Sequence, residues 1–334
     1  MSTTLTKKDF VSNQEIRWCP GCGDYGILTA IQKTLPGLGV PLENFVFVSG
    51  IGCSSRFPYY MNTYGFHTIH GRAPAIASGV KIANPELSVW VITGDGDGLS
   101  IGGNHLIHAM RRNLDINIIM FNNRIYGLTK GQFSPTSAEG TVSKSSPYGS
   151  IDHPFNPISV ALGAESSFVA RTYDKSQKHM SEIFEAAFKH KGTSFIEILQ
   201  NCIIFNDGVH DKIYGKEVRD DTIISLEHNK PLKFGNELDK GIVIEGSVAK
   251  VVSLKDTPVE KLHIHDETVH SPDYAFLLSR MDIPEFPVPM GVFRAVERPV
   301  YEDLVTNQIQ KSIDSKGNGS LEELIYTEDS WEIK

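Results

Sequence analysis

The sequence predicts an α/β fold, a doubly wound parallel sheet with helices on both faces, followed by a C-terminal extension. Two observations indicate this class. Short apolar, β-branched runs alternate with longer helical patterns, and the alternation stops near Asp207. Strands that alternate with helices of this length are typical of βαβ units. We therefore expect residues 1–210 to form the domain that carries the chemistry, and residues 211–334 to pack on this core or on a partner chain.

The individual elements follow from their apolar periodicity. The expected strands are 45–49, 89–93, 117–121, 168–170 and 194–199, and the expected helices are 26–35, 73–83, 99–112, 156–162 and 176–190. After residue 207 the pattern becomes mixed, and 283–289 is rich in proline. A long arm without a clear hydrophobic period seldom folds alone.

Composition narrows the function classes. The chain has 334 residues, of which 40% are hydrophobic and 22% charged, as in an ordinary globular protein. Its net charge of -8 gives no basic footprint, so we expect no nucleic-acid partner. Neither a signal peptide at the start nor an apolar run of membrane-spanning length is visible. We expect a cytoplasmic protein without membrane contact.

The most informative segment follows the expected strand 89–93. It reads Gly94-Asp95-Gly96-Asp97-Gly98, and Asn122-Asn123 follows the next strand. Because the carboxyl ends of parallel strands meet at one edge of a sheet, Asp95 and Asn123 should lie close together. Carboxylate and amide oxygens suit Mg²⁺ shared with phosphates, and glycines let backbone N–H groups approach a phosphate. The helix expected to begin near Leu99 would present its N-terminus to the same anion.

This segment has three other interpretations. An EF-hand loop starting at Asp95 requires Glu at its twelfth position, where Leu106 stands. A dinucleotide-binding loop requires Gly-x-Gly-x-x-Gly, which Gly94, Gly96 and Gly98 do not fit. A plain glycine-rich turn after a strand stays open for the motif alone, although the double Asn disfavours it.

The chain has four cysteines, Cys19, Cys22, Cys53 and Cys202. Cys53 and Cys202 each follow an expected strand, so they should lie at the same sheet edge as Asp95. Four thiolates can hold a cubane iron–sulfur cluster, and tetrahedral Cys₄ serves structural zinc equally well. For Cys202, the most isolated of the four, a second interpretation also stays open: a buried thiol that binds no metal.

The Gly-Asp-Gly and Asn-Asn pair resembles the thiamine diphosphate fingerprint. The resemblance implies a sheet of the thiamine-diphosphate-binding type, with Mg²⁺ held by Asp95, Asn123 and the carbonyl of Ile125. It also implies that the backbone of residues 94–97, which includes Gly94, Gly96 and Asp97, meets the diphosphate.

With the cysteines added, the chain resembles the β (thiamine-binding) subunits of the 2-oxoacid:ferredoxin oxidoreductases. The resemblance rests on residues 18–24, 50–54, 70–73, 94–97 and 122–132 and covers most of 15–210. Residues 286–300 resemble the C-terminal part of the 2-oxoglutarate-type members.

This family implies a CoA-dependent, reversible oxidative decarboxylation of a 2-oxoacid, here 2-oxoglutarate to succinyl-CoA and CO₂. Thiamine diphosphate serves as the electron sink, and electrons pass singly through a [4Fe-4S] cluster to ferredoxin. A separate α subunit supplies the Glu that binds the aminopyrimidine ring, and two αβ units form (αβ)₂. Because a cluster beside thiamine has a redox role that zinc lacks, the resemblance favours iron over zinc.

Four further residues are candidates for catalysis or substrate binding. Lys130 is expected to bind the substrate carboxylate, and Leu128 to line the substrate cavity. Arg72 is expected to steer an anion or cap a helix, and His70 to shuttle a proton or serve as a structural His. A solvated loop Lys is the ordinary alternative for Lys130.

Competing functions stay open. One is a pyruvate or branched-chain 2-oxoacid enzyme of the same family. The others are a non-oxidative thiamine decarboxylase or synthase, and a zinc-stapled non-catalytic subunit.

Overall fold

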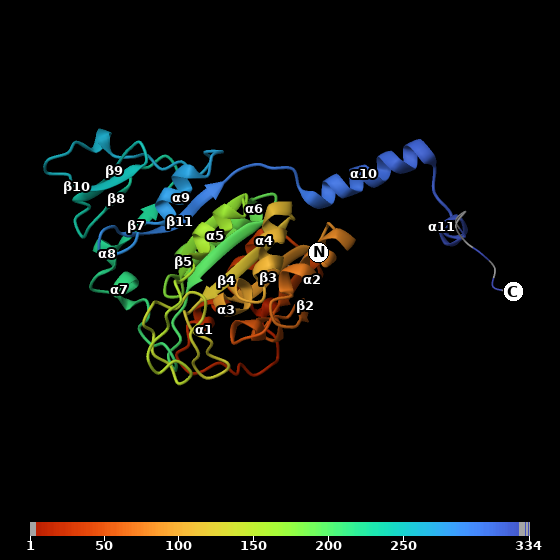
Figure 1. Ribbon diagram of the computed structural model, residues 1–334, viewed down its shortest axis with the longest axis horizontal. Helices are drawn as coiled ribbons and strands as arrows, with labels where there is room; N and C mark the ends of the chain where they lie inside the picture. The colour runs from red at the N-terminus through yellow and green to blue at the C-terminus, as the bar shows by residue number, and fades with distance from the viewer. Residues whose placement is uncertain (1–4, 327–330, 332, 334) are drawn as a thin grey trace.

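The structure is a computed structural model that describes residues 5–326, 331 and 333. Its centre is an eight-stranded sheet with the order β2-β1-β3-β4-β6-β5-β11-β7 (Figure 1). The strands are β1 (Phe45–Ser49), β2 (Tyr64–His67), β3 (Ser88–Gly94), β4 (Ile116–Asn122), β5 (Phe168–Tyr173), β6 (Ser194–Leu199), β7 (Ile223–Leu226) and β11 (Val288–Ala295). Neighbouring strands from β2 to β5 run parallel, so their carboxyl ends share one edge of the sheet.

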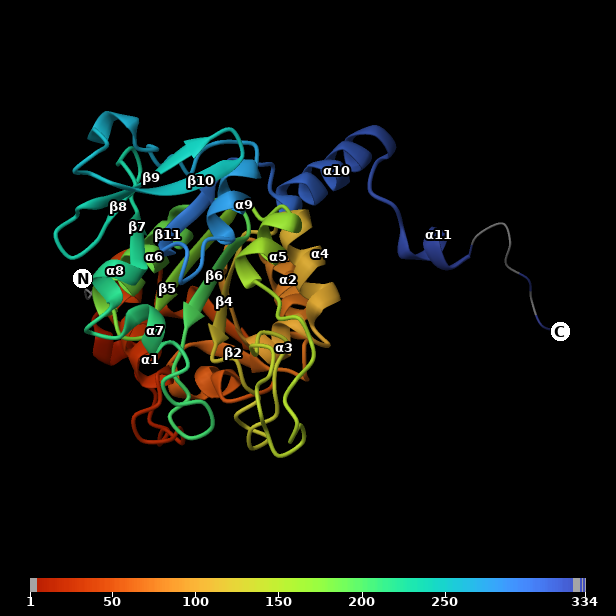
Figure 2. The same ribbon diagram turned by 60° about the vertical axis from the view of Figure 1, so that its left-hand side comes forward.

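Helices cover both faces of this sheet (Figure 2). They are α1 (Asp24–Thr34), α2 (Ala73–Ala83), α3 (Asp95–Leu99), α4 (Gly103–Arg112), α5 (Pro157–Gly163) and α6 (Gln177–Lys189). Successive strand residues point to opposite faces. In β1, Phe45 and Phe47 join the apolar cluster formed with α1 and α6, whereas Val46 and Val48 join the cluster formed with α2, α4 and α5. The expected α/β class and its two-sided winding are confirmed.

All five expected strands are present, and 45–49 and 194–199 have the expected bounds. The expected helix 99–112 is wrong in its bounds. The chain becomes helical already at Asp95, α3 ends at Leu99, and α4 begins at Gly103. The break allows Gly102 to pack against the backbone of Gly71: a Cβ at Gly102 would lie 2.9 Å from the Gly71 Cα. The first turn after β3 therefore starts at Asp95 and not at Leu99.

Residues 211–334 contribute two strands to the central sheet. β11 runs antiparallel to β5 and parallel to β7. The helices here are α7 (Asp211–Tyr214), α8 (Arg219–Thr222), α9 (Asp273–Ser279), α10 (Tyr301–Lys316) and α11 (Leu321–Ile325). A separate antiparallel sheet consists of β8 (Lys233–Phe234), β9 (Lys240–Glu245) and β10 (Val248–Ser253). The division at residue 210 stays a prediction.

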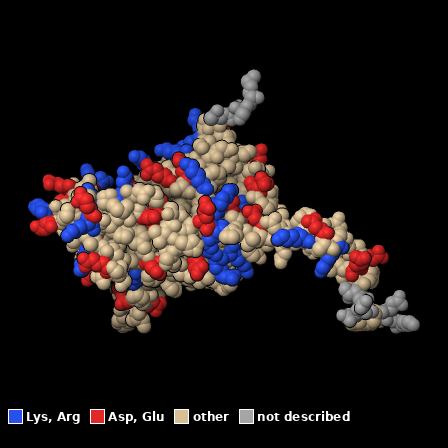
Figure 3. Space-filling model, turned by 90° about the horizontal axis from the view of Figure 1, so that it is seen from above, with Lys and Arg blue, Asp and Glu red and all other residues tan. Residues whose placement is uncertain are grey.

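The helices α10 and α11 project away from the body of the molecule (Figures 1 and 2). On the face seen in Figure 3, basic and acidic side chains are interspersed over the body and along this arm. None of the helices within residues 5–326 is both long and apolar enough to cross a membrane.

His190, directly after α6, predicts a loss of stability in acid. Its Nε2 lies 2.7 Å from Ser167 Oγ, and burial, which outweighs the attraction of Asp115, lowers the pKa of His190 to about 4. Since its unfolded pKa is near 6.5, the neutral imidazole stabilises the fold above pH 6.5, and this contribution is lost as the pH falls toward 4. We expect a loss on the order of 2 kcal/mol in urea unfolding between pH 7 and pH 4.5.

The His190→Gln variant should lack this part of the pH dependence, whereas His153→Gln, which changes an exposed imidazole, should retain it. An identical acid-induced loss of the free energy of unfolding in His190→Gln and the wild type would contradict the assignment.

Candidate active site

A cavity of about 170 Å³ lies at the carboxyl ends of β1, β3 and β4. Ligands of open α/β sheets bind at this edge, where loops from several strands converge. The lining residues include Asp24, Ile51, Gly52, Cys53, Ser54, His70, Gly94, Asp95, Gly96, Asp97, Asn123, Ile125, Tyr126, Gly127, Leu128 and Thr129. All six residues expected to contact the diphosphate or Mg²⁺ are among them. We call it the cofactor cavity.

Asp95 starts α3 directly after β3, and only 2% of the residue is exposed. Its Oδ2 accepts hydrogen bonds from Ser134 Oγ and Thr136 Oγ1, each at 2.5 Å, whereas Oδ1 takes part in neither bond. Burial raises the pKa of Asp95, and the two hydroxyl groups oppose that rise. A buried carboxylate stays ionised only where hydrogen bonds or a cation compensate for its lost hydration. Asp95 is therefore suited to hold a metal ion through Oδ1.

Asn123 and Ile125 line the same cavity from the loop after β4. The N–H of Ile125 donates to Asn123 Oδ1 at 3.1 Å, which fixes the turn, and the amide oxygen keeps a second lone pair. Asn206 Nδ2 donates to the carbonyl of Asn123 at 3.0 Å and ties the loop down. With Asp95, these residues offer a carboxylate, an amide oxygen and a backbone carbonyl. This set of hard oxygen donors fits Mg²⁺.

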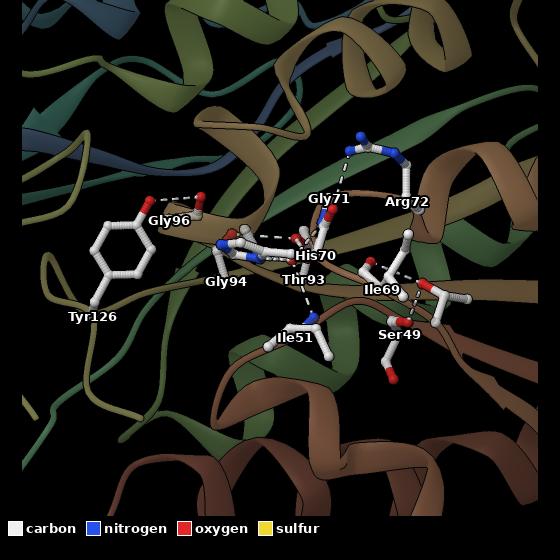
Figure 4. A network of polar contacts seen from close by, with 12 residues as sticks. Ser49, Ile51, Ile69, His70, Gly71, Arg72, Thr93, Gly94, Gly96 and Tyr126 are labelled. Carbon is white, nitrogen blue, oxygen red and sulfur yellow. Dashed lines mark hydrogen bonds and ion pairs between the residues drawn. The ribbon is translucent and has the colours of Figure 1, made fainter. Parts of the chain in front are cut away.

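Gly96 allows an aromatic ring to close one side of the cavity. A Cβ at this position would lie 2.2 Å from Tyr126 Cε1, so a larger residue would displace the ring. The Tyr126 hydroxyl donates to the carbonyl of Gly96 at 3.1 Å (Figure 4). The segment 94–97 thus presents its backbone to the cavity, as expected for a diphosphate contact.

The Asp97 carboxylate joins three loops beneath the cavity. Its Oδ1 accepts from the N–H groups of Ile51 (3.0 Å) and Gly71 (2.7 Å), and its Oδ2 accepts from Thr93 Oγ1 (2.7 Å). His70 Nδ1 lies 2.5 Å from the same Oδ1. The carboxylate therefore fixes the imidazole with the proton on Nδ1 and leaves Nε2 as an acceptor. Because the side chain of Asp97 is hydrogen-bonded to these loops, Asp97 can contact a diphosphate only through its backbone.

Arg72 lines neither the cofactor cavity nor the cysteine cavity, which is described next. Its Nη1 donates to the carbonyl of His70 at 3.0 Å (Figure 4). Gly71, between the two, has φ of 69°, a left-handed conformation that favours glycine. Arg72 is the N-cap residue of α2 by position, but its side chain makes no capping hydrogen bond, so both roles expected for it stay predictions.

The four cysteines line one further cavity, of about 240 Å³, which we call the cysteine cavity. Cys19 is exposed, Cys22 and Cys53 are half-buried, and Cys202 is buried. Two hydrogen bonds bring the N-terminal pair to Cys202: Gly23 N–H donates to the carbonyl of Asn201 at 3.1 Å, and Gln200 Nε2 lies 3.3 Å from Cys22 Sγ. The predicted convergence of the thiols is thus present.

Burial raises the pKa of the Cys22 thiol far above its usual range and that of Cys53 to about 12. The nearby Asp24 carboxylate adds to both shifts. These thiols are therefore neutral in the metal-free chain. A thiolate here needs a bound metal, because the thiolate is the metal ligand and the metal supplies the positive charge.

Leu128 and Lys130 lie on a tight turn beside both cavities. Lys130 N–H donates to the carbonyl of Gly127 at 3.0 Å, and Lys130 itself has φ of 75°. Leu128 lines both cavities and is 42% exposed, whereas Lys130 lines the cysteine cavity. Leu128 thus lies where the two cavities meet, whereas Lys130 does not line the cofactor cavity, and the substrate roles of both residues stay predictions.

Sequence reasoning missed three side chains of this site. Asp24, buried between the two cavities, lies two residues after Cys22, the end of the Cys-x-x-C segment, and that position was the available signal. Burial and the neighbouring Asp174 raise the pKa of Asp24 to about 7. Ser134 and Thr136 reach Asp95 from a loop with no motif, so nothing in the sequence pointed to them.

The parallel sheet and an oxygen-lined cavity at its carboxyl edge fit a domain that binds thiamine diphosphate. In agreement, residues 50–198 match the family described as thiamine pyrophosphate enzyme, C-terminal TPP binding domain. The chain belongs to the β subunits of the 2-oxoacid:ferredoxin oxidoreductases. It is 51% identical, over 98% of its length and 88% of the relative, to the 2-oxoglutarate oxidoreductase subunit KorB of Mycobacterium tuberculosis.

Two further comparisons agree with this family. The β subunit of 2-oxoacid:ferredoxin oxidoreductase 1 from Aeropyrum pernix is 48% identical over 63% of this chain and 64% of the relative. A solved structure of 2-oxoglutarate:ferredoxin oxidoreductase from Magnetococcus marinus, with 2-oxoglutarate, coenzyme A and succinyl-CoA bound, covers 96% of this chain and 94% of that chain. Its TM-score is 0.75 and its identity 31%.

Proposed function

We propose that Asp95, Asn123 and the carbonyl of Ile125 hold Mg²⁺ with thiamine diphosphate, beside a [4Fe-4S] cluster on the four cysteines. One observation supports this most: the cofactor cavity and the cysteine cavity share a wall. Both are lined by Asp24, Cys53, Asn123, Gly127 and Leu128. At the centre of that wall, a Cβ on Gly127 would lie 3.5 Å from Cys202 Sγ and 3.6 Å from Cys53 Sγ. Thiamine diphosphate in one cavity and a cluster in the other would therefore be neighbours across these residues.

The spacing of the thiols supports a cluster over zinc. In a tetrahedral site with Zn–S bonds of about 2.3 Å, the sulfur atoms are roughly 3.8 Å apart. Among the described residues, no three of the cysteines have their sulfur atoms within 4.8 Å of one another. The group that meets this distance is His228, Asp266 and Glu267. A cubane binds each sulfur to a different iron and needs them farther apart.

When bound, thiamine diphosphate supplies the carbanion chemistry for decarboxylation of a 2-oxoacid. The residues of this chain orient the substrate and move protons. His70, fixed by Asp97, holds or accepts a proton at Nε2. Leu128 borders the substrate, and the Lys130 ammonium attracts its carboxylate.

We propose 2-oxoglutarate as the substrate, coenzyme A as the acyl acceptor and ferredoxin as the electron acceptor. The names of the Mycobacterium tuberculosis and Magnetococcus marinus relatives support the substrate. The coenzyme A and succinyl-CoA bound to the Magnetococcus marinus enzyme support the acyl acceptor. A soluble electron carrier and coenzyme A also support a cytoplasmic location.

An α subunit completes the site in this proposal. None of the described residues that line the cofactor cavity is a glutamate, so the Glu for the aminopyrimidine ring comes from the α subunit. We infer an αβ unit that pairs again into (αβ)₂.

The test is an assay of the anaerobically purified αβ complex with 2-oxoglutarate, pyruvate and branched-chain 2-oxoacids, with coenzyme A and a viologen dye. We expect CoA-dependent dye reduction that is at least about tenfold faster with 2-oxoglutarate than with the others. Faster reduction with another 2-oxoacid would overturn the substrate. CO₂ release without dye reduction, in protein that lacks iron and sulfide, would indicate the non-oxidative decarboxylase.

A further inference from the structure

A row of buried polar side chains leads away from Asp95 across three strands. Thr136 Oγ1 lies 2.5 Å from Asp95 Oδ2 and 2.9 Å from Asn122 Oδ1, and its single hydroxyl proton is shared between these two acceptors. Asn122 Nδ2 donates to Glu197 Oε1 at 2.7 Å, and Arg171 Nε donates to Glu197 Oε2 at 2.7 Å. Each of the five residues is at most 5% exposed. We call this row the polar relay.

The outer end of the polar relay is an ion pair built into the sheet. Arg171 of β5 and Glu197 of β6 are register partners on adjacent strands. A buried ion pair contributes little net stability, because desolvation of both charges offsets their attraction, and apolar residues of similar size often replace such pairs without loss. A requirement of the fold alone therefore does not account for the pair.

What the pair does locally is to orient Asn122. The Glu197 carboxylate only accepts hydrogen bonds, so the Asn122 amide must turn its NH₂ group toward Glu197 and its Oδ1 toward Thr136. A bond to an ionised acceptor is stronger than one between neutral groups. The acceptor oxygen of Glu197, together with the Arg124 N–H that donates to Asn122 Oδ1 at 3.3 Å, thereby fixes the amide, and the amide in turn contacts Thr136.

On one side of the polar relay, the side chains face a cavity instead of packed neighbours. Asn122, Thr136, Arg171 and Glu197 all line a cavity of about 310 Å³, and Asp95 lines the cofactor cavity. The polar relay therefore forms part of a wall between two open spaces. Side chains in such a wall have few neighbours on one side, so hydrogen bonds decide their positions.

We infer that Glu197, supported by Arg171, is a positioning residue for the metal edge of the cofactor cavity: through Asn122 and Thr136 it sets Asp95 for Mg²⁺. Asn122 directly precedes the proposed ligand Asn123, so the same bond also holds the end of β4. This inference rests on the proposed function, because it assumes that Mg²⁺ binds at Asp95.

The test compares two double variants in the αβ complex. Arg171→Met/Glu197→Met removes both charges and the acceptor for Asn122, whereas Arg171→Met/Glu197→Gln removes the charges but keeps a carbonyl acceptor. The measurements are equilibrium binding of thiamine diphosphate as a function of Mg²⁺ concentration, the thermal unfolding temperature, and the maximal rate at saturating Mg²⁺.

We expect the Met/Met variant to need at least about tenfold more Mg²⁺ for half-maximal binding. Its unfolding temperature and its rate at saturating Mg²⁺ should stay close to those of the wild type. The Met/Gln variant should need less than about threefold more Mg²⁺. Equal Mg²⁺ requirements in the two variants, or a loss that follows the unfolding temperature alone, would overturn the inference.

A second pair of variants keeps the inference testable if the double variants do not assemble. Thr136→Val removes the hydroxyl of the polar relay, and Thr136→Ser restores it. We expect the Mg²⁺ requirement to rise with Val and to return with Ser, and equal values for both would overturn the inference. If the wild-type complex binds no thiamine diphosphate with Mg²⁺, the proposed function fails instead.

Discussion

The Asp95→Asn variant should lose Mg²⁺-dependent binding of thiamine diphosphate by at least about 100-fold, and with it all 2-oxoacid oxidation. The substitution keeps the size of the side chain but removes the negative charge that the buried site offers to the cation. Asn can still accept the Ser134 and Thr136 hydroxyl bonds, so the loop should stay in place. Equilibrium binding of the cofactor with increasing Mg²⁺ measures the loss.

The iron content of Asp95→Asn should equal that of the wild type, because Asp95 does not line the cysteine cavity. Asp152→Asn makes the same chemical change at an exposed position and serves as the control. Binding of the cofactor by Asp95→Asn with wild-type affinity for Mg²⁺ would remove Asp95 from the metal site.

The Cys202→Ser variant should have the opposite effect to Asp95→Asn: it should lose the cluster and keep thiamine diphosphate. We expect loss of iron and sulfide and a fall of at least about 100-fold in dye reduction, with thiamine diphosphate binding retained. A serine hydroxyl is a poor substitute for a thiolate toward iron, and Cys202 is the most buried of the four candidate ligands. Metal and sulfide analysis of the anaerobically purified complex measures the first effect.

Ile203→Val changes the next residue along the same cavity wall and should leave iron, sulfide and rate unchanged. Iron and sulfide at the wild-type level in Cys202→Ser would show that the fourth ligand lies elsewhere. Zinc in place of iron in the wild type would contradict the cluster itself.

The sequence allowed prediction of those parts of the site that follow strands. β1, β3, β4 and β6 are buried runs with clear bounds, so Cys53, Asp95, Asn123 and Cys202 could be assigned to one sheet edge before any coordinates. Such strands are recognisable because both of their faces are apolar. The convergence of the cysteines follows from that edge.

Other parts depend on contacts between distant segments and leave no local pattern. Thr136 reaches Asp95 across a long loop, and the Arg171–Glu197 pair depends on strand register. β11 was missed because Pro289 lies inside it, and proline ordinarily argues against a strand. The break between α3 and α4 depends on the close approach of Gly102 to Gly71.

The uneven exposure of the four thiols has a consequence for how the proposed enzyme behaves in air. Cys202 is buried and Cys19 is exposed, so a cluster held by the four thiols would be nearest to solvent at Cys19. An electron acceptor and dioxygen would then both reach the cluster from the side of Cys19. A protein that binds over Cys19 to accept electrons would therefore also protect the cluster from dioxygen. Without a bound partner, the subunit should lose the visible absorbance of the cluster fastest in air.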